Sequence, residues 1–571
     1  MNILFAENSL KEISELNQET IKDLALDEII DHIARSDGEK RIIRDVFRKI
    51  PLDMADVTFR QQILSDLMAN EGLTEDLTEI LDQIKALKEC ETMKMALLHQ
   101  EDSLYVLLEK LRELSVYVNV SEDIVKCLKK YNVKADGLLK ILDHLDKVVS
   151  DEWFEQSKTD INKMLEELSN VRSAMVGVNF TADLNIEEVS VVEFLPHRIR
   201  SKYKIAEIAA SMGSIVNTGS SANSMGAPNV NTRVLDPLLV TMTPQIEKHM
   251  KRHYTKIKKV MAKHIRLDSS FVTELYEGLT FYLAMSRFAK RLIAGGCEIC
   301  MPQLTEQSDS FLMKDLYNVR LFFANEKNIV KNDFSFSRKE NLYILTGPNR
   351  GGKTIIEQSL GIISIMASIG SFVTASSCVG RPFTKILTHF PVDENLTINY
   401  GRLGEEAVRI RELVAKADER TLILFNETYS TTSAADGLYL SMDLLRVLKE
   451  LGAAAIFNTH IHELAKAIDE MNAWSGESDI ISIVMEIVNN VNTFRIKRSE
   501  PELKSYARNI AQKYEITYEQ MIQNKKAVSQ DTVFFIVYFN TSSSDRIRPP
   551  LSVCALNRGF SLAIKLYHFF P

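Results

Sequence analysis

The stretch Tyr343–Thr354, which reads YILTGPNRGGKT, decides the fold of this 571-residue chain. An apolar strand runs into a glycine-rich turn that ends in Lys353 and Thr354, and an apolar helix follows. Both the spacing and the strand, loop and helix context are those of a phosphate-binding loop. In such a loop backbone N–H groups surround the phosphates, the lysine neutralises the β- and γ-oxygens, and the hydroxyl can bind Mg²⁺. The sequence therefore predicts a site for ATP and Mg²⁺.

Two later strands end in polar side chains that belong at the ligand edge of the same sheet. TLILFNE ends in Asn426 and Glu427, and AAAIFNTH ends in Thr459 and His460. In P-loop ATPases such an acidic strand serves the magnesium shell, and a neighbouring Glu can activate the attacking water. Asn426 brings no negative charge, so we expect weakened metal affinity, while His460 could sense the γ-phosphate. An exposed Glu after an ordinary buried strand and a structural His are the simpler alternatives.

The sequence pattern changes along the chain. Up to about Arg291 apolar residues recur at helical spacing, as at Leu73, Leu77, Ile80, Leu81, Ile84 and Leu87. Beyond about Phe311 short apolar strands alternate with helices, the strands being Leu342–Thr346, Ile386–Phe390, Thr421–Phe425 and Ala453–Asn458. We predict a mixed fold: an all-α N-terminal core and lever region, residues 1–310, with a flexible loop at 211–232; an ABC-like α/β P-loop NTPase domain, residues 311–524; and an unassigned tail, residues 525–571.

Composition limits the partner classes. A formal charge of −8 excludes a uniformly basic nucleic-acid surface, so DNA contact needs a local patch. The basic run from His249 to Arg266 is either such a patch or a solvated helix face. The uncharged run 358–380 is broken by Ser, Thr and Gly, and it predicts a buried helix leading into a strand rather than a membrane span. Six cysteines without a leader predict a cytoplasmic protein, with Cys297 and Cys300 as half a metal site or ordinary thiols.

Taken together, the segments TGPNRGGKT, NETYSTTSAADG and NTHIHEL resemble the MutS family of DNA mismatch-repair ATPases. Upstream, IVKND at 329–333 is similar to the family's nucleotide-binding segment. Downstream, LKSYARNIAQKYEI at 503–516 is similar to its closing segment. The resemblance is specific over about 311–525. It is weaker in ALDEIIDHI and in PLDMADVTFRQQILSDL at 51–67, which look like the start of the family's helical core.

The resemblance implies roles for individual residues. Asn332 would lie near the adenine, Glu427 would be the general base, and His460 would lie near the γ-phosphate. Ser433 would reach across a homodimer with composite ATPase sites, and Thr354 and Asn426 would serve Mg²⁺. ATP would be held by Gly347, Pro348, Asn349, Gly351, Gly352, Lys353 and Thr354. The chain departs from the family at Asn426, where the family has Asp, which puts the hydrolysis rate in question. It also departs at Arg350, where the family often has Met, which should alter only the outer face of the loop.

The resemblance further implies an ATP-driven dimeric clamp whose helical levers close around DNA. Because the chain begins almost at the helical core, we expect no mismatch-reading or connector domain, and no C-terminal nuclease domain. We therefore expect branched or irregular DNA to be bound through its phosphates. One alternative is a nucleotide-gated protein-interaction module with little hydrolysis or DNA binding. Another alternative is a P-loop ATPase of the transporter or chromosome-maintenance type. The lack of a recognisable LSGGQ-like segment before Thr421 argues against it.

Overall fold

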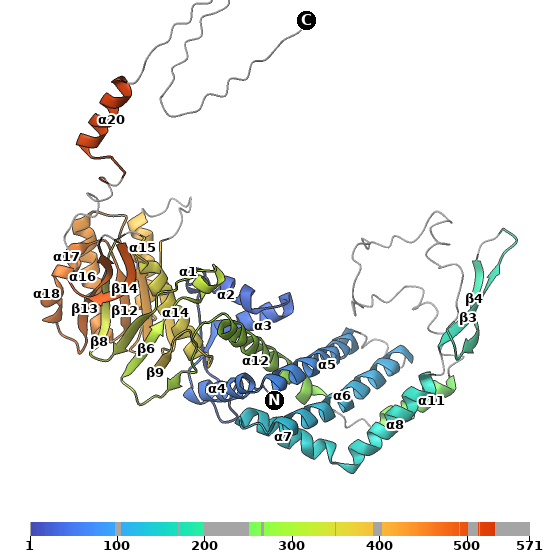
Figure 1. Ribbon diagram of the computed structural model, residues 1–571. Coiled ribbons are helices and arrows are strands. Elements are labelled where there is room, and N and C mark those ends of the chain that lie inside the picture. Colours follow the sequence, from blue (N-terminus) through green and yellow to red (C-terminus); the bar gives the residue numbers. More distant parts are fainter. Residues whose placement is uncertain are drawn as a thin grey trace, which may run out of the picture.

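The computed structural model describes residues 2–96, 104–169, 172–183, 186–198, 251–263, 268–348, 350–391, 402–489, 491–500, 512 and 514–530. An α/β body carries a curved arm of helices (Figure 1). The predicted loop at 211–232, most of the 503–516 segment and the tail beyond residue 530 lie outside the described residues.

Amphipathic helices build the arm and its junction with the body. The expected stripe on α5 is buried from Leu73 to Leu87, which confirms the helical period. Helix α12 packs against α3, α4 and α5, and α8 and α11 lie side by side farther along the arm. The helices are α1 (Gln18–Asp23), α2 (Leu26–Ile33), α3 (Asp37–Arg48), α4 (Met54–Ala69), α5 (Glu71–Ala96), α6 (Leu104–Tyr131), α7 (Asp136–Val149), α8 (Glu152–Ser169), α11 (Lys251–Lys263) and α12 (Ser270–Ala294).

Two antiparallel strand pairs correct the all-α expectation for this region. Strand β1 (Ile13–Glu15) pairs with β2 (Lys49–Pro51), and β3 (Ser173–Phe180) pairs with β4 (Ile186–Leu195). The second pair lies at the far end of the arm (Figure 1). Its sequences, SAMVGVNF and IEEVSVVEFL, contain β-branched valines at alternating positions, which favour a pleated strand over a helix.

A six-stranded sheet forms the centre of the body, in the order β10-β11-β12-β8-β13-β14. The first five strands are parallel and β14 is antiparallel to β13, so the prediction of a mostly parallel sheet is confirmed. A smaller sheet in the order β5-β9-β6-β7 packs beside it. The strands are β5 (Gln303–Leu304), β6 (Ser310–Leu316), β7 (Asn332–Ser337), β8 (Glu340–Thr346), β9 (Ser377–Gly380), β10 (Lys385–His389), β11 (Thr421–Asn426), β12 (Ala454–Asn458), β13 (Asp479–Val488) and β14 (Val491–Arg498).

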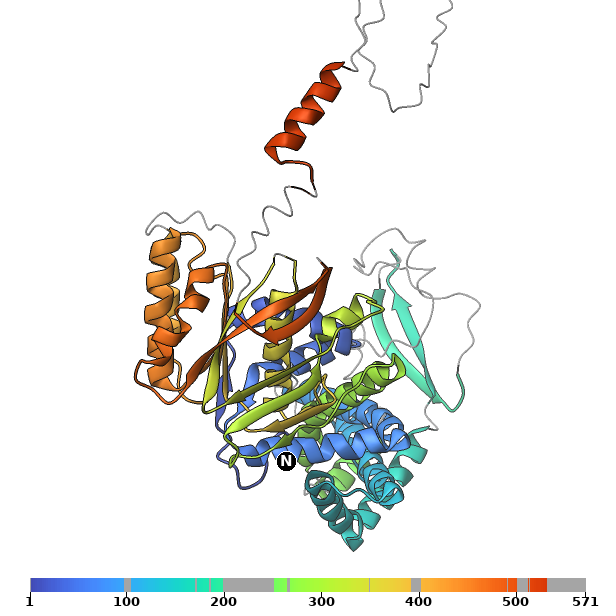
Figure 2. The same cartoon turned by 60° about the vertical axis from the view of Figure 1, so that its left-hand side comes forward.

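Helices cover both faces of the central sheet. Helix α16 lies on one face, and the blue N-terminal helices lie on the other side of the body (Figure 2). Helix α14 is buried along almost its whole length in the core that the body shares with the arm, and β9 follows it, so the predicted buried helix and strand are confirmed. The helices of the body are α13 (Val319–Phe323), α14 (Lys353–Ser368), α15 (Arg402–Val414), α16 (Ala434–Leu451), α17 (His462–Lys466) and α18 (Ile468–Asn472). A further helix, α20 (Tyr518–Gln530), stands apart from the body (Figure 1).

Polar contacts fasten the arm to α14 and to the sheet. The buried Arg60 guanidinium donates to the carbonyls of Leu4 (2.7 Å) and Ile369 (3.3 Å), and so ties α4 and the N-terminal segment to the residue that follows α14. The Gln358 amide of α14 donates to the carbonyl of Asp23 (2.7 Å) at the end of α1. The helix that begins at the phosphate loop is therefore held directly by the arm.

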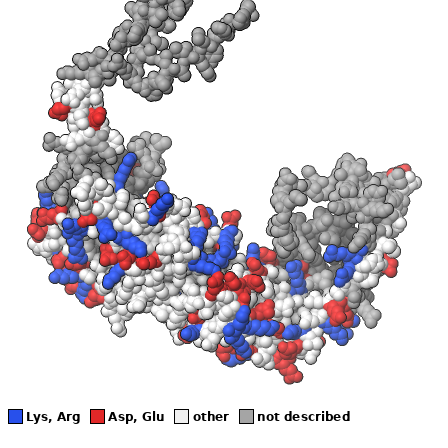
Figure 3. Space-filling view, in the orientation of Figure 1, with Lys and Arg blue, Asp and Glu red and all other residues white. Residues whose placement is uncertain are grey.

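Two lysines of the basic run are ion-paired within the arm. Lys256 and Lys263 of α11 pair with Glu167 and Asp160 of α8, so these two lysines join neighbouring helices. Acidic and basic side chains are interspersed over the visible face of the arm (Figure 3).

Two further expectations concern metals and membranes. Cys297 and Cys300 are free thiols, and the described residues contain no cluster of three or more His, Cys, Asp or Glu that could hold a metal ion. In the same part of the chain, no helix combines the length and apolarity needed to cross a bilayer.

Candidate nucleotide-binding site

The phosphate loop has a backbone shape that requires glycine at two positions. Gly347 has φ +146° and Gly352, which precedes the first residue of α14, has φ +94°. A Cβ on Gly347 would lie 2.9 Å from the Met485 Cβ, and one on Gly352 would lie 3.1 Å from the Phe494 ring. The loop is therefore packed against β13 and β14. Asn349 lies outside the described residues. Arg350 is exposed but also lines the cavity described below, so it is not confined to the outer face of the loop as expected.

Lys353 turns back into the curve of the loop. Its Nζ donates to the carbonyls of Gly347 (3.0 Å) and Pro348 (3.3 Å), and the side chain is buried. Burial lowers the pKa of Lys353, while the carboxyl groups of Glu427 and Glu357 oppose that shift. A desolvated ammonium with only carbonyl partners is ready to exchange them for phosphate oxygens, which make stronger, charge-assisted hydrogen bonds.

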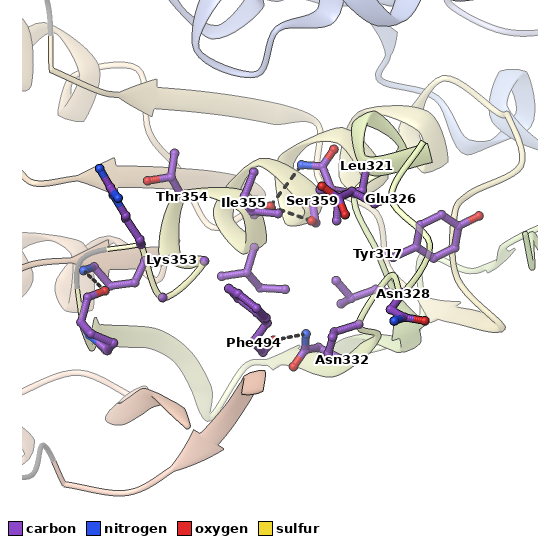
Figure 4. A pocket seen from close by; sticks show the side chains of 18 of the residues that line it. Tyr317, Leu321, Glu326, Asn328, Asn332, Lys353, Thr354, Ile355, Ser359 and Phe494 are labelled. Atoms are coloured by element: carbon purple, nitrogen blue, oxygen red, sulfur yellow. Dashed lines mark hydrogen bonds between the residues drawn. The ribbon is translucent and has the colours of Figure 1, made fainter. Parts of the chain in front are cut away.

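A cavity of about 450 Å³ opens beside the loop (Figure 4). Lys353 and Thr354 line it on the loop side, and Tyr317 and Asn328 line it at a distance from them. This volume lies in the range of small-molecule and cofactor sites. Of the predicted residues, the cavity is lined by Asn332, Pro348, Gly351, Gly352, Lys353, Thr354 and Glu427.

Asn332, the first residue of β7, lies in the cavity wall with its amide already engaged. Its Nδ2 donates to the carbonyl of Phe494 (3.1 Å), and its Oδ1 accepts from the N–H of Ile496 (2.8 Å). The side chain thus fastens β14 to β7 and holds Phe494 on the cavity (Figure 4). A contact between Asn332 and adenine stays a prediction.

Glu427 and His460 meet just beyond the ends of β11 and β12. His460 Nε2 lies 2.8 Å from Glu427 Oε1, and both side chains are partly exposed. Glu427 has φ +53°, an unfavourable conformation for a non-glycine residue, and its N–H donates to the carbonyl of Asn458 (2.9 Å). The two predicted residues therefore form a pair, of which Glu427 lines the cavity. A carboxylate held in this way can accept a proton from a water molecule.

Beneath the loop, the side chains of Asn426, Asn458 and Glu357 form a buried hydrogen-bond chain. Asn426 Nδ2 faces Thr354 Oγ1 at 3.4 Å, and Asn426 Oδ1 accepts from Asn458 Nδ2 at 2.7 Å. Asn458 Nδ2 also donates to Glu357 Oε2 at 3.0 Å. Asn458 and Glu357 are fully buried, and burial raises the pKa of Glu357 well above its usual range.

The side chains at this position suit a magnesium ion only in part. Mg²⁺ takes oxygen ligands and keeps several waters, and it is held by one or two carboxylates together with substrate phosphates. Thr354 offers a hydroxyl and Glu427 offers a carboxylate, but Asn426 presents its N–H₂ group to Thr354. In this orientation Asn426 cannot ligate a cation or accept a hydrogen bond from a bound water.

Ser433 lies outside the cavity, at the start of α16. Its Oγ accepts from the N–H of Asp436 (3.1 Å) and donates to the carboxylate of the same residue (2.7 Å), so it caps the helix. The side chain is exposed. A role across a dimer stays a prediction.

The sequence interpretation missed several cavity and support residues. Tyr317 follows β6 and Phe494 lies on β14, and no motif marks either of them. Two others had a usable signal: Glu357 follows Lys353 by four positions on one helix face, and Asn458 precedes the quoted Thr459 and His460.

Comparison with known proteins gives two family matches. The model of MutS domain V matches residues 343–531, and the model of the MutS2 N-terminal domain matches residues 52–294. The chain is 28% identical over 230 residues to the DNA mismatch repair proteins MutS of Bacillus cereus and Bacillus mycoides. The matched part is 40% of this chain and 25% and 26% of theirs, so the chain spans about a quarter of the length of these relatives.

Proposed function

Because this chain belongs to the MutS family, we propose that it is an ATP-dependent DNA-binding protein of the mismatch-repair type. ATP occupies the cavity beside the phosphate loop, with its phosphates at Lys353 and its base toward Tyr317 and Asn328. One observation supports this proposal above the others. The loop and the strand-end Glu427 line one cavity of nucleotide size, and His460 pairs with Glu427 beside it.

Each residue of the site has a separate role in the proposed hydrolysis of ATP. Lys353 exchanges its two carbonyl partners for β- and γ-phosphate oxygens. Glu427 accepts a proton from the attacking water, and His460 orients its carboxylate. The Thr354 hydroxyl would hold Mg²⁺, which would supply positive charge to the phosphates when bound. Asn426 would take part only if its amide turned its oxygen toward the ion, because its N–H₂ group faces Thr354 in the structure.

In this proposal the nucleotide state reaches DNA through the arm. Helix α14 begins at the phosphate loop and is bonded to the arm at Gln358, and Arg60 of the arm holds Ile369 just after its end. A change at the loop therefore bears on the arm directly. Two copies form a homodimeric clamp, in which Ser433 contributes to the partner's nucleotide site. The clamp binds branched or irregular DNA, mainly through phosphates.

The first test is Mg²⁺-dependent ATP turnover with and without a four-way DNA junction. We expect turnover that Glu427→Ala abolishes and that the junction alters. DNA binding is measured separately at low salt with ATP, where phosphate contacts are strongest. Negligible affinity for both duplex and branched DNA under these conditions would refute the DNA part of the proposal.

A second candidate function is a nucleotide-gated protein-interaction module with little hydrolysis. It is favoured by Asn426, which lacks the charge of an acid and turns an N–H₂ group toward Thr354. Under this alternative Asn426→Asp sharply raises turnover. If Glu427 and the loop suffice for catalysis, the same substitution changes turnover little.

A further inference from the structure

The hydrogen-bond chain formed by the side chains of Asn426, Asn458 and Glu357 can run in only two directions, which we call its polarities. In the observed one, Asn458 donates through its N–H₂ group to both Glu357 and Asn426, and Asn426 points its own N–H₂ group at Thr354. Turning Asn426 alone would place two N–H₂ groups 2.7 Å apart, so Asn458 must turn with it.

Inversion of the Asn458 amide places a condition on the protonation state of Glu357. Once inverted, Asn458 presents its carbonyl oxygen to Glu357 Oε2 at 3.0 Å, where an ionised carboxylate would give two acceptors in contact. A protonated carboxyl group removes this conflict because it donates to that oxygen. The inverted polarity, with the Asn426 oxygen toward Thr354, therefore exists only when Glu357 carries a proton.

We propose that Glu357 is a positioning residue that, as a neutral acid, lets Asn458 and Asn426 invert so that Asn426 offers its oxygen at the magnesium position of the loaded site. This inference rests on the proposed nucleotide function. A protonated Glu357 on α14 thus allows an oxygen to face the magnesium position, as an acidic side chain at position 426 on β11 would do. With its oxygen turned toward Thr354, Asn426 would offer an acceptor to the hydration shell of a bound ion instead of opposing the ion with a donor.

The surroundings of Glu357 favour the neutral acid. The side chain is completely buried, and the charged groups that act on it are Lys353, which attracts its anion, and Glu427, which repels it. When the Lys353 ammonium moves to phosphate oxygens, its attraction for a Glu357 anion weakens. In the observed polarity Glu357 Oε1 and Asn458 Oδ1 have no hydrogen-bond partner, so within the described residues no other side chain fixes the orientation of this amide.

The test measures binding of a fluorescent ATP analogue over a Mg²⁺ titration, starting from EDTA, so that the readout is not turnover. Glu357→Gln keeps an N–H donor for the inverted amide, and we expect its Mg²⁺ half-saturation within about twofold of the unmodified protein. Glu357→Met has no donor and should raise half-saturation about tenfold, the effect of losing roughly one hydrogen bond to a charged site. Nucleotide affinity in EDTA should be the same in all three proteins.

A double substitution separates positioning from damage to the fold. The carboxylate introduced by Asn426→Asp presents oxygens in either polarity, so adding Glu357→Met to that background should shift Mg²⁺ half-saturation less than about twofold. An equal shift in both backgrounds, or no shift in either, would overturn the inference while leaving the nucleotide site intact. Absence of nucleotide binding by the unmodified protein, with and without Mg²⁺, would instead overturn the proposed function and this inference with it.

Discussion

Replacement of Gly347 by alanine tests how firmly the phosphate loop is built before any nucleotide binds. At φ +146° an alanine is strained, which costs about 1–2 kcal/mol. Its Cβ would also lie 2.9 Å from the Met485 Cβ and 3.3 Å from the Met485 backbone nitrogen, and such overpacking costs about 1–3 kcal/mol. Alanine recovers about 0.4–1 kcal/mol by restricting the unfolded chain. The net loss should therefore be about 1–5 kcal/mol.

The matched control is Gly296→Ala. Gly296 has φ +78°, but an added Cβ meets nothing within 4 Å, so it carries the backbone strain without the contact. At about 2–4 °C per kcal/mol, Gly347→Ala should lower the thermal midpoint by roughly 2–20 °C and Gly296→Ala by no more than about 6 °C, so Gly347→Ala should be the less stable of the two. Scanning calorimetry without nucleotide measures both. If Gly347→Ala were no less stable than Gly296→Ala, the packing of the loop against β13 would be refuted.

Three further substitutions probe the supports of the site. Burial lowers the pKa of His389 from 6.5 to about 4, so as pH falls the unfolded chain binds a proton at this residue before the folded chain does. Roughly 3 kcal/mol of folding stability is therefore lost between pH 6.5 and pH 4. His389→Gln should remove this loss, which is measured by comparing unfolding scans at pH 7 and pH 4.5. Asn332→Ala removes both side-chain hydrogen bonds to β14, so it should lower folding stability by about 1–3 kcal/mol and speed amide hydrogen exchange at Ile496. Unchanged exchange at Ile496 would contradict the role of Asn332 in holding β14 to β7. Arg60→Met leaves the carbonyls of Leu4 and Ile369 without their guanidinium donor and should cost about 2–5 kcal/mol in thermal unfolding; unchanged stability would contradict this tie between α4 and the residue after α14.

The parts of the site that could be predicted are those encoded locally. The phosphate loop is a continuous motif, and Glu427 and His460 follow apolar strands whose ends must share one edge of a parallel sheet. That edge brings the two side chains within 2.8 Å of each other. The MutS resemblance, drawn from these same segments, is confirmed by the two family matches.

The parts that could not be predicted depend on tertiary placement. Tyr317 and Phe494 reach the cavity from chain segments on either side of the motif, and as aromatic residues they do not differ in pattern from the core. The contact between Asn426 and Asn458 follows from strand register, which pairs these two positions directly. The β3–β4 pair was missed because its short alternating pattern lies between long helical segments, and the amphipathic period dominates the whole region.

The most direct measurement of the central claim is calorimetric titration of Mg²⁺–ATP into the unmodified protein and into Lys353→Ala. Exposed Lys259, on α11, supplies the control substitution Lys259→Ala. We expect one ATP per chain, an affinity about 10- to 100-fold weaker for Lys353→Ala because charge-assisted bonds to the phosphates are lost, and no change for the control. Equal affinity for all three proteins, or no binding by the unmodified protein, would contradict the placement of ATP at this loop.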